Sequence, residues 1–158
     1  DPRSEFGGRR PGAIHRGTFN ANPLAAAAGI AALKIVATGE PQRRADATAA
    51  RLREGMQNVL NKHRVAGVVY GDVSTFHIYF GSAGNGSIEG LSAAELKGIP
   101  KKTVSALQQA LRMRGVDLMS YTGGLTSLAH TEEDVRQTVQ AFEGAVTELL
   151  GQGLLERR

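Results

Sequence analysis

The sequence NPLAAAAGIAALKIV, residues 22–36, does most to decide the fold. Asn22 is a good N-cap, and Pro23 suits the first helical position because its missing N–H would be unpaired there anyway. The alanines that follow propagate a helix, which the stretch TGEP at residues 38–41 ends. Small side chains let another backbone approach closely, so we expect this helix to be buried on several sides.

Helices and strands alternate on the C-terminal side of this first helix. The predicted helices cover Pro41 to about His63, Ser92 to Arg114 with a break at Gly98 and Pro100, and Thr131 to about Leu150. The predicted strands cover Val65–Val69, Thr75–Phe80, Val116–Met119 and Leu125–Ala129, the last two around a turn at residues 122–124. This order of elements predicts an α+β domain, in which helices pack on a small sheet.

The spacing of apolar residues supports these elements. In the helix after Pro41, apolar residues recur every three or four positions, at Ala45, Ala49, Leu52, Met56, Val59 and Leu60. In the second strand, Phe76, Ile78 and Phe80 alternate with polar or mixed residues, as expected when one face of a sheet is buried. Thr131 is a good N-cap, and the three carboxylates that follow it suit the positive end of a helix dipole.

The composition is that of a globular protein, with 158 residues, 41% apolar and 22% charged. The net charge of +4 comes from scattered basic residues without interleaved aromatic residues, so nothing favours nucleic-acid binding. The sequence has no cysteine, which excludes disulfides and fits a reducing cytosol. The longest apolar stretch, residues 23–37, is too short and alanine-rich for a membrane span, and no secretory signal pattern opens the chain. We therefore expect a cytoplasmic protein that binds neither membranes nor nucleic acid.

Two motifs resemble a known enzyme family. They are GTFNANPLAAAAG at residues 17–29 and LTSLAHTEED at residues 125–134, with the tripeptide RGV at residues 114–116 between them. The same motifs occur in this order in the C-terminal part of class III aminotransferases, which are pyridoxal-phosphate enzymes of fold type I. The second motif is most similar to that of the glutamate-1-semialdehyde 2,1-aminomutase branch. The resemblance covers residues 7 to 150.

The resemblance implies a domain organisation. Residues 7–40 would be the end of a large pyridoxal-phosphate domain and a linking helix, residues 41–150 the small C-terminal α+β domain, and residues 151–158 a tail. Residues 1–6 are interpreted as a cloning remnant, since they show no periodicity and end in Glu-Phe, a common scar. Enzymes of this family are homodimers with active sites at the subunit interface, so we expect a homodimer.

The resemblance also implies pyridoxal 5'-phosphate as the cofactor of the complete enzyme. In the family, the pair that corresponds to Gly17 and Thr18 reaches the cofactor phosphate of the partner subunit. Glycine lets the backbone approach an anion, and Thr18 offers a hydroxyl and an N–H, although the two residues alone favour a plain turn. We name no catalytic residue, because the family's Schiff-base lysine should precede Gly17, and the chain begins too late to hold it. None of the lysines present, at positions 34, 62, 97, 101 and 102, has the context of that lysine.

The remaining polar residues suggest no other chemistry. The four histidines, at positions 15, 63, 77 and 130, form no metal-ligand pattern, and His130 is interpreted as a structural residue beside the capping Thr131. Residues 116–129 contain no arginine, whereas some class III aminotransferases hold the substrate carboxylate with an arginine there. Two hypotheses remain open. The chain is part of an enzyme that moves an amino group on an amino acid or amino-aldehyde, by transfer or by isomerisation, or it is a catalytically inactive fragment that acts as a dimerising or structural module.

Overall fold

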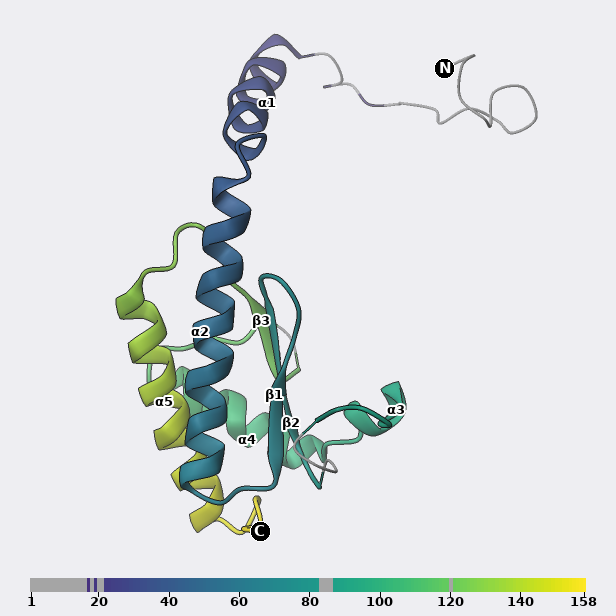
Figure 1. The fold of residues 1–158 in the computed structure, drawn as a ribbon, viewed down its shortest axis with the longest axis vertical. Coiled ribbons are helices and arrows are strands. Elements are labelled where there is room, and N and C mark those ends of the chain that lie inside the picture. Colours follow the sequence, from purple (N-terminus) through teal and green to yellow (C-terminus); the bar gives the residue numbers. More distant parts are fainter. Residues whose placement is uncertain (1–16, 18, 20–21, 83–86, 120) are drawn as a thin grey trace, which may run out of the picture. The chain divides into compact units, whose positions relative to one another are not determined.

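The structure is a computed structural model of the chain, and it describes residues 17, 19, 22–82, 87–119 and 121–158. The chain divides into two units, Asp1–Thr38 and Gly39–Arg158. The elements follow the order α1 (Pro23–Val36), α2 (Glu40–Lys62), β1 (Gly67–Tyr70), β2 (Thr75–Phe80), α3 (Ala93–Leu96), α4 (Lys101–Arg112), β3 (Gly123–Leu125) and α5 (Glu132–Gly151), as Figure 1 shows. The predicted α+β class is confirmed.

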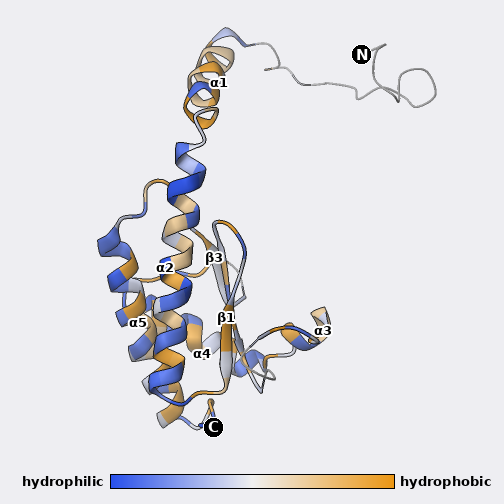
Figure 2. Ribbon diagram, viewed as in Figure 1, coloured by the Kyte–Doolittle hydropathy of each residue, from blue (hydrophilic) through white to orange (hydrophobic). Residues whose placement is uncertain are grey.

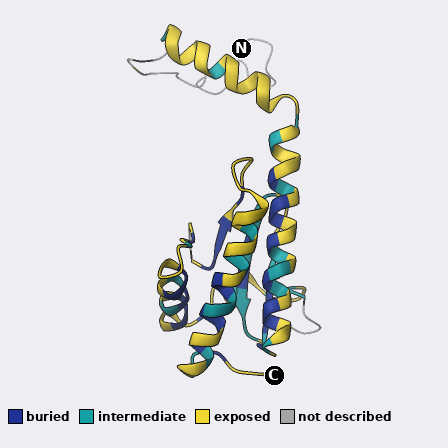
Figure 3. Ribbon diagram, turned by 90° about the vertical axis from the view of Figure 1, so that its left-hand side faces the viewer, coloured by how far each residue is buried: buried dark blue, intermediate teal, exposed yellow. Residues whose placement is uncertain are grey.

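Helix α1 begins where the sequence predicts. The Oδ1 atom of Asn22 accepts hydrogen bonds from the N–H groups of Leu24 and Ala25, at 2.9 and 3.3 Å. The expected burial on several sides is not seen, because no residue of α1 is buried and Leu33 is 67% exposed (Figure 3). Lys34 is its only charged residue, so apolar side chains surround the helix axis. A helix that is apolar on all sides is normally covered by other parts of a protein.

None of the helices in the described ranges is by itself long and apolar enough to cross a membrane. Among the residues that the structure places, α1 and α2 reach the required length and composition when they are taken together.

The second unit is built on an antiparallel sheet of three strands in the order β1–β2–β3. Val69 pairs with Ile78 in the first ladder, and Phe76 pairs with Gly124 in the second. Helices α2 and α5 lie side by side, α4 contacts α5, and α2 contacts β1 and β2 (Figure 1). The side chains between these helices and the sheet form one core. Its largest fully buried members are Phe142, Met56, Leu60, Ile78, Leu107, Leu111, Leu149, Val65 and Val146.

Helix α2 shows the amphipathic pattern that the sequence predicts. All six apolar residues named above are buried on one side, and the other side is hydrophilic (Figure 2). The same helix holds the turn between β1 and β2, since the Arg53 guanidinium donates to the carbonyl oxygens of Val73 and Thr75 at 3.1 and 2.6 Å. These bonds, with one from the Val73 N–H to the Asp72 carboxylate at 2.8 Å, stabilise Val73 at a φ of 41°, which a β-branched residue rarely adopts.

The prediction of strands around residues 116–129 is wrong in part. Residues 116–119 form no strand, and β3 is Gly123–Leu125, within and just after the predicted turn. The alternation that suggested a strand is real, because Val116 and Leu118 are turned towards the core while Asp117 and Met119 are exposed. This burial is achieved without pairing to a neighbouring strand. The first predicted strand is also shifted, from Val65–Val69 to β1.

The predicted helix from Ser92 to Arg114 is two helices, α3 and α4, separated at the Gly98–Pro100 break. Helix α4 ends at Arg112 with Met113 as its C-cap, and the expected terminating glycine, Gly115, follows two residues later with a φ of 81° and an N–H that donates to the carbonyl of Arg112 at 3.0 Å. Helix α5 opens with the predicted cap. The Thr131 hydroxyl accepts from the Asp134 N–H, while the Asp134 carboxylate accepts from the Thr131 N–H at 2.6 Å, a reciprocal capping box.

The residues after α5 pack back onto the domain. Leu155 is buried in the core, and Arg157 forms an antiparallel bridge with Val65. The Arg158 N–H donates to the carbonyl of Arg64 at 2.7 Å, and its guanidinium donates to the carbonyl of Gly67 at 3.2 Å. The chain end therefore lies beside the residues that lead into β1.

Candidate functional site

The residues for which the sequence predicts a cofactor role lie just before α1. Gly17 is exposed, and Thr18 lies outside the described residues, so their contact with a phosphate stays a prediction. The start of α1 nearby is described. Its first turn, which is described in full, carries no acidic residue, and Asn22 caps it. The dipole of this helix favours an anion near its start, although the N–H groups of Leu24 and Ala25 already donate to Asn22.

None of the five lysines lies in the surroundings that a cofactor-binding lysine needs. Such a lysine requires a buried site that lowers its pKa and makes its amine a nucleophile. All five lysines of the sequence are exposed. The Lys62 ammonium forms an ion pair with Glu143 at 2.7 Å on the surface.

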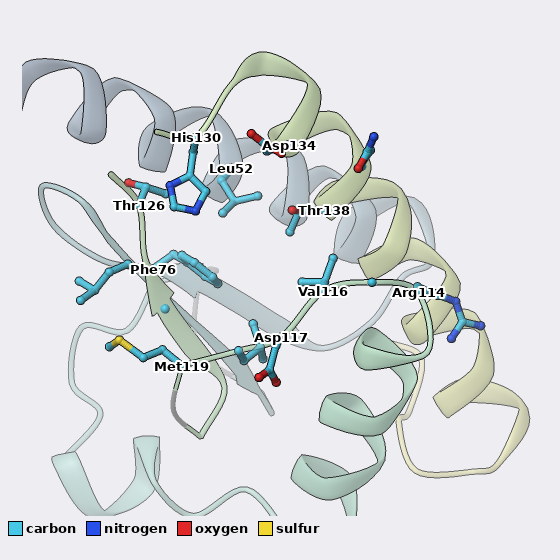
Figure 4. A pocket seen from close by; sticks show the side chains of 15 residues that line it. Leu52, Phe76, Arg114, Val116, Asp117, Met119, Thr126, His130, Asp134 and Thr138 are labelled. Carbon is cyan, nitrogen blue, oxygen red and sulfur yellow. The ribbon is translucent and has the colours of Figure 1, made fainter. Parts of the chain in front are cut away.

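A cavity that the sequence did not predict lies in the second unit. It has a volume of about 330 Å³, is partly open to solvent, and lies between β3, the segment 114–119 and the first half of α5 (Figure 4). Its apolar lining comes from Leu52, Phe76, Val116, Leu118, Met119 and Leu125. Its polar lining comes from Thr126, His130, Asp134, Gln137 and Thr138, with Arg114 and Asp117 at one end. The cavity exists because segment 116–119 stays apart from β3 instead of pairing with it.

Two glycines shape the β3 wall of this cavity. A Cβ atom on Gly124 would lie 2.9 Å from Cε1 and Cζ of the Phe76 ring, so only glycine lets the ring cross the strand there. A Cβ atom on Gly123 would meet the His77 ring on the other face. The Gly-Gly pair that suggested a turn is thus explained by close packing against β2.

His130 lies at the junction between β3 and α5, as its interpretation as a structural residue requires. Its Nδ1 atom accepts a hydrogen bond from the Ser127 N–H at 3.0 Å, and the Ser127 hydroxyl lies 3.1 Å from the same atom. The pair does not form a catalytic triad, because within the described part of the chain no carboxylate hydrogen-bonds to the His130 ring.

The charged groups around the cavity are bound by other protein groups. The pKa of the Asp134 carboxyl is lowered by hydrogen bonds from the Thr131 backbone N–H and then from the Thr131 hydroxyl. Arg114 donates to the Ala110 carbonyl at 2.7 Å and pairs with Glu148 at 2.9 Å. Arg112 pairs with Asp117 at 2.9 Å.

The other histidines lie apart from one another. His63 contacts the Glu143 carboxylate at 2.9 Å, and the ring of His77 lies 5.3 Å from that of Tyr70. His15 is outside the described residues. Among the residues that the structure places, no group of three histidine, aspartate or glutamate side chains could hold a metal ion.

Known proteins resemble the chain in sequence. It is 31% identical over 137 residues to a glutamate-1-semialdehyde 2,1-aminomutase of Methanopyrus kandleri, covering 85% of the chain and 31% of that protein. It is 33% identical over 135 residues to one of Pyrobaculum arsenaticum, covering 84% and 31%. The chain thus spans about a third of the length of these curated relatives. No family model matches the sequence.

Solved structures resemble it in fold. An omega-transaminase from Sphaerobacter thermophilus superposes with a TM-score of 0.69 at 31% identity, covering 88% of the chain and 31% of that protein. A transaminase described with pyridoxal phosphate bound has a TM-score of 0.68 at 26% identity, covering 90% and 31%. A β-phenylalanine aminotransferase from Variovorax paradoxus has a TM-score of 0.63 at 27% identity, covering 94% and 33%.

Proposed function

The chain corresponds to the C-terminal part of a class III aminotransferase of the glutamate-1-semialdehyde aminomutase type, and from this premise we propose that it is the C-terminal portion of a pyridoxal-phosphate enzyme that moves an amino group. The substrate is an amino acid or an amino-aldehyde. The reaction is either amino transfer or an isomerisation from glutamate-1-semialdehyde to 5-aminolevulinate. The observation that carries this proposal is the match to relatives of that name over 84–86% of the chain.

In this proposal the chain supplies no cofactor-binding lysine. The exposure of all five lysines supports this, since none lies in a site that would make its amine nucleophilic. The cofactor would supply the electron-withdrawing ring on which amino groups are moved. The residues of this chain would contribute phosphate contacts from Gly17 and Thr18 to the partner subunit of a homodimer. The α+β unit would be the small domain of the enzyme.

The absence of an arginine between residues 116 and 129 favours the isomerisation over transfer between dicarboxylic substrates. The arginines just before this segment do not replace it, because Arg112 is paired with Asp117 and Arg114 with Glu148. The substrate carboxylate would therefore be bound by another part of the complete enzyme.

The alternative is that the chain is a catalytically inactive module that only dimerises or supports other chains. The exposed apolar surface of α1 supports this alternative, because a surface of this kind binds other chains. The two hypotheses differ in one measurable property. The first requires the chain to function when joined to the remainder of an aminomutase, and the second does not.

A chimera tests the proposal. The matched 137 residues of the Methanopyrus kandleri relative are replaced by this chain, and conversion of glutamate-1-semialdehyde is measured beside amino transfer to a 2-oxo acid. We expect the chimera to bind pyridoxal phosphate and to catalyse the isomerisation. A folded, cofactor-binding chimera with neither activity would favour the inactive module.

Thr18→Val in the same chimera tests the phosphate contact. A hydrogen bond to a charged acceptor contributes roughly 1.5–3 kcal/mol, so cofactor affinity should fall about tenfold to a hundredfold. The matched control is Thr131→Ala, which removes a helix cap and should leave cofactor affinity unchanged. Unaltered affinity in Thr18→Val would make Gly17 and Thr18 only the turn before α1.

The isolated chain tests the lysine claim. It is mixed with pyridoxal phosphate, reduced with borohydride and digested, and the labelled lysines are identified by mass spectrometry. We expect sparse labelling spread over the exposed lysines. One lysine labelled stoichiometrically would contradict the proposal.

A further inference from the structure

The protonation of the His130 ring follows from its hydrogen bond. A backbone N–H can only donate, so the bond of 3.0 Å from the Ser127 N–H requires Nδ1 to be an unprotonated acceptor. While this bond is made, the imidazole is neutral and carries its proton on Nε2. The turn at residues 127–130 therefore holds the ring as a hydrogen-bond donor at Nε2.

That donor is available to a ligand. Within the described ranges of the chain, the recorded hydrogen bonds of the His130 ring all involve Nδ1. Figure 4 shows the ring turned into the cavity, near Leu52 and Thr126 and above Phe76. Its Nε2–H is thus presented beside an apolar surface that backbone packing keeps in place.

The neighbouring charges leave the cavity without a free cation, although the exposed carboxylate of Asp134 keeps its negative charge. The carboxylate of Asp134 is held by Thr131, the guanidinium of Arg114 by Glu148, and Asp117 by Arg112. Besides His130, the neutral polar side chains on the lining are Thr126, Gln137 and Thr138. An anionic ligand would lose hydration here without gaining a free cation, and a cationic one would gain only the exposed and hydrated Asp134 carboxylate, whereas a neutral acceptor would gain the His130 donor.

We propose that this cavity is a binding site for a small uncharged molecule with a compact apolar body and a carbonyl oxygen, which His130 recognises through its Nε2–H. The volume of about 330 Å³ lies at the lower end of the range for small-molecule sites, which favours a single-ring or short aliphatic ligand. The apolar body contacts Phe76, Leu52 and Val116. The site is independent of the proposed cofactor contacts at Gly17 and Thr18.

The histidine tautomer is tested first, on the full chain labelled with ¹⁵N. Long-range proton–nitrogen correlation spectra above pH 8 distinguish the two neutral tautomers, and His130→Phe identifies the signals. We expect His130 to carry its proton on Nε2. A ring protonated on Nδ1 would overturn the proposal, whatever the behaviour of the variants.

Ligand recognition is tested with benzamide, benzoate and toluene as probes. We expect benzamide to cause saturable shifts in the amide signals of Leu125, Thr126 and His130, with benzoate and toluene binding more weakly. His130→Phe should weaken benzamide binding about threefold to tenfold, the effect of one neutral hydrogen bond. His63→Phe, outside the cavity, should bind like the parent chain. Equal binding of benzamide and toluene, or no saturable shift at these three residues, would refute the site.

Discussion

Helices α1 and α5 both begin with a good cap, yet their surroundings are opposite. In α1, Asn22 accepts hydrogen bonds from two N–H groups, and no residue of the helix is buried. In α5, Thr131 and Asp134 form a capping box, and the helix buries five residues, Ala141, Phe142, Ala145, Val146 and Leu149. Caps thus locate both helices in the sequence, but only packing against other elements distinguishes a stable helix from a marginal one.

The difference can be seen in the two apolar patterns. Helix α5 carries charged residues on one side and a continuous apolar stripe on the other, so the chain itself can bury the stripe against α2 and α4. Helix α1 is apolar on all sides except at Lys34, a pattern that suits burial within a larger protein. An apolar stripe on one side of a helix needs neighbours on that side only, and the 158-residue chain provides them for α5.

Amide exchange should show the largest contrast between the two helices. We expect the amides of Phe142 to Leu149 to exchange only through global unfolding, which costs about 5–15 kcal/mol in a typical domain. The amides of Leu24 to Ile35 should exchange through local opening at a cost near zero. Native-state hydrogen exchange of the isolated chain measures both. Equal protection would mean that α1 is covered in solution.

Removing one large side chain from each helix should give the next largest contrast. Phe142 is 0% exposed, so Phe142→Ala should destabilise the second unit by about 3–5 kcal/mol. Leu33→Ala, at a side chain that is 67% exposed, should change the unfolding free energy of that unit by less than about 0.5 kcal/mol. Urea midpoints with unchanged slopes give both values. A large loss in Leu33→Ala would show that α1 supports the domain.

Removing the helix caps should change stability less than removing Phe142. Loss of the α5 cap should lower the unfolding free energy of the second unit, and loss of the α1 cap should leave it unchanged. Thr131→Ala should cost about 1 kcal/mol, because the Asp134 N–H loses its acceptor. Asn22→Ala should lower the helical signal in far-ultraviolet circular dichroism and leave the urea midpoint of the domain unchanged. If Asn22→Ala moved that midpoint as far as Thr131→Ala, the two units would unfold together.

The smallest contrast concerns pH. The pKa of Glu143 in α5 is lowered by hydrogen bonds from Lys62, the larger cause, and from His63. Because the pKa of Glu143 is lower in the folded state, its ionised carboxylate stabilises the fold at pH values above the unfolded pKa of about 4.3. This stabilisation is lost as the pH falls through the folded pKa. Glu143→Gln should therefore cost under about 1 kcal/mol at pH 7, as expected for a surface pair, and nothing in strongly acidic solution. Urea midpoints at both pH values test this, and a cost that is independent of pH would contradict it.

Much of the fold could be predicted because local rules and packing agree. Pro23 and Thr131 mark helix starts, Gly115 marks a helix end, and the period of apolar residues identifies the buried side of α2. The wrong prediction at residues 116–129 concerns a segment where local sequence rules and tertiary packing disagree. Alternating burial suggested a strand at Val116, and two glycines suggested a turn, but Gly124 is required by the Phe76 ring packed across β3. A contact between segments 48 positions apart leaves no local signal in the sequence.

The candidate site could be predicted only through resemblance. Gly17 and Thr18 have no local pattern that separates a phosphate contact from a turn, and only the motif around them suggests one. The sequence gives a weaker indication of the cavity beside β3, because His130 is the one residue of its lining that stands out as a candidate for chemistry. Its lining comes from four elements and two loops, and their convergence depends on the sheet order. Sequence periodicity describes each element alone and cannot show that convergence.

The chain end beside β1 has a consequence for behaviour at high concentration. Exposed edge strands invite pairing with the strands of other molecules, which leads to aggregation. Arg157 and Arg158 already occupy backbone groups of Val65 and Arg64 at the start of β1, and both carry positive charges that repel an identical neighbour. Deleting these two arginines would leave that edge unprotected without removing any large core side chain. The shortened chain should therefore form intermolecular β-structure at concentrations where the intact chain stays dispersed.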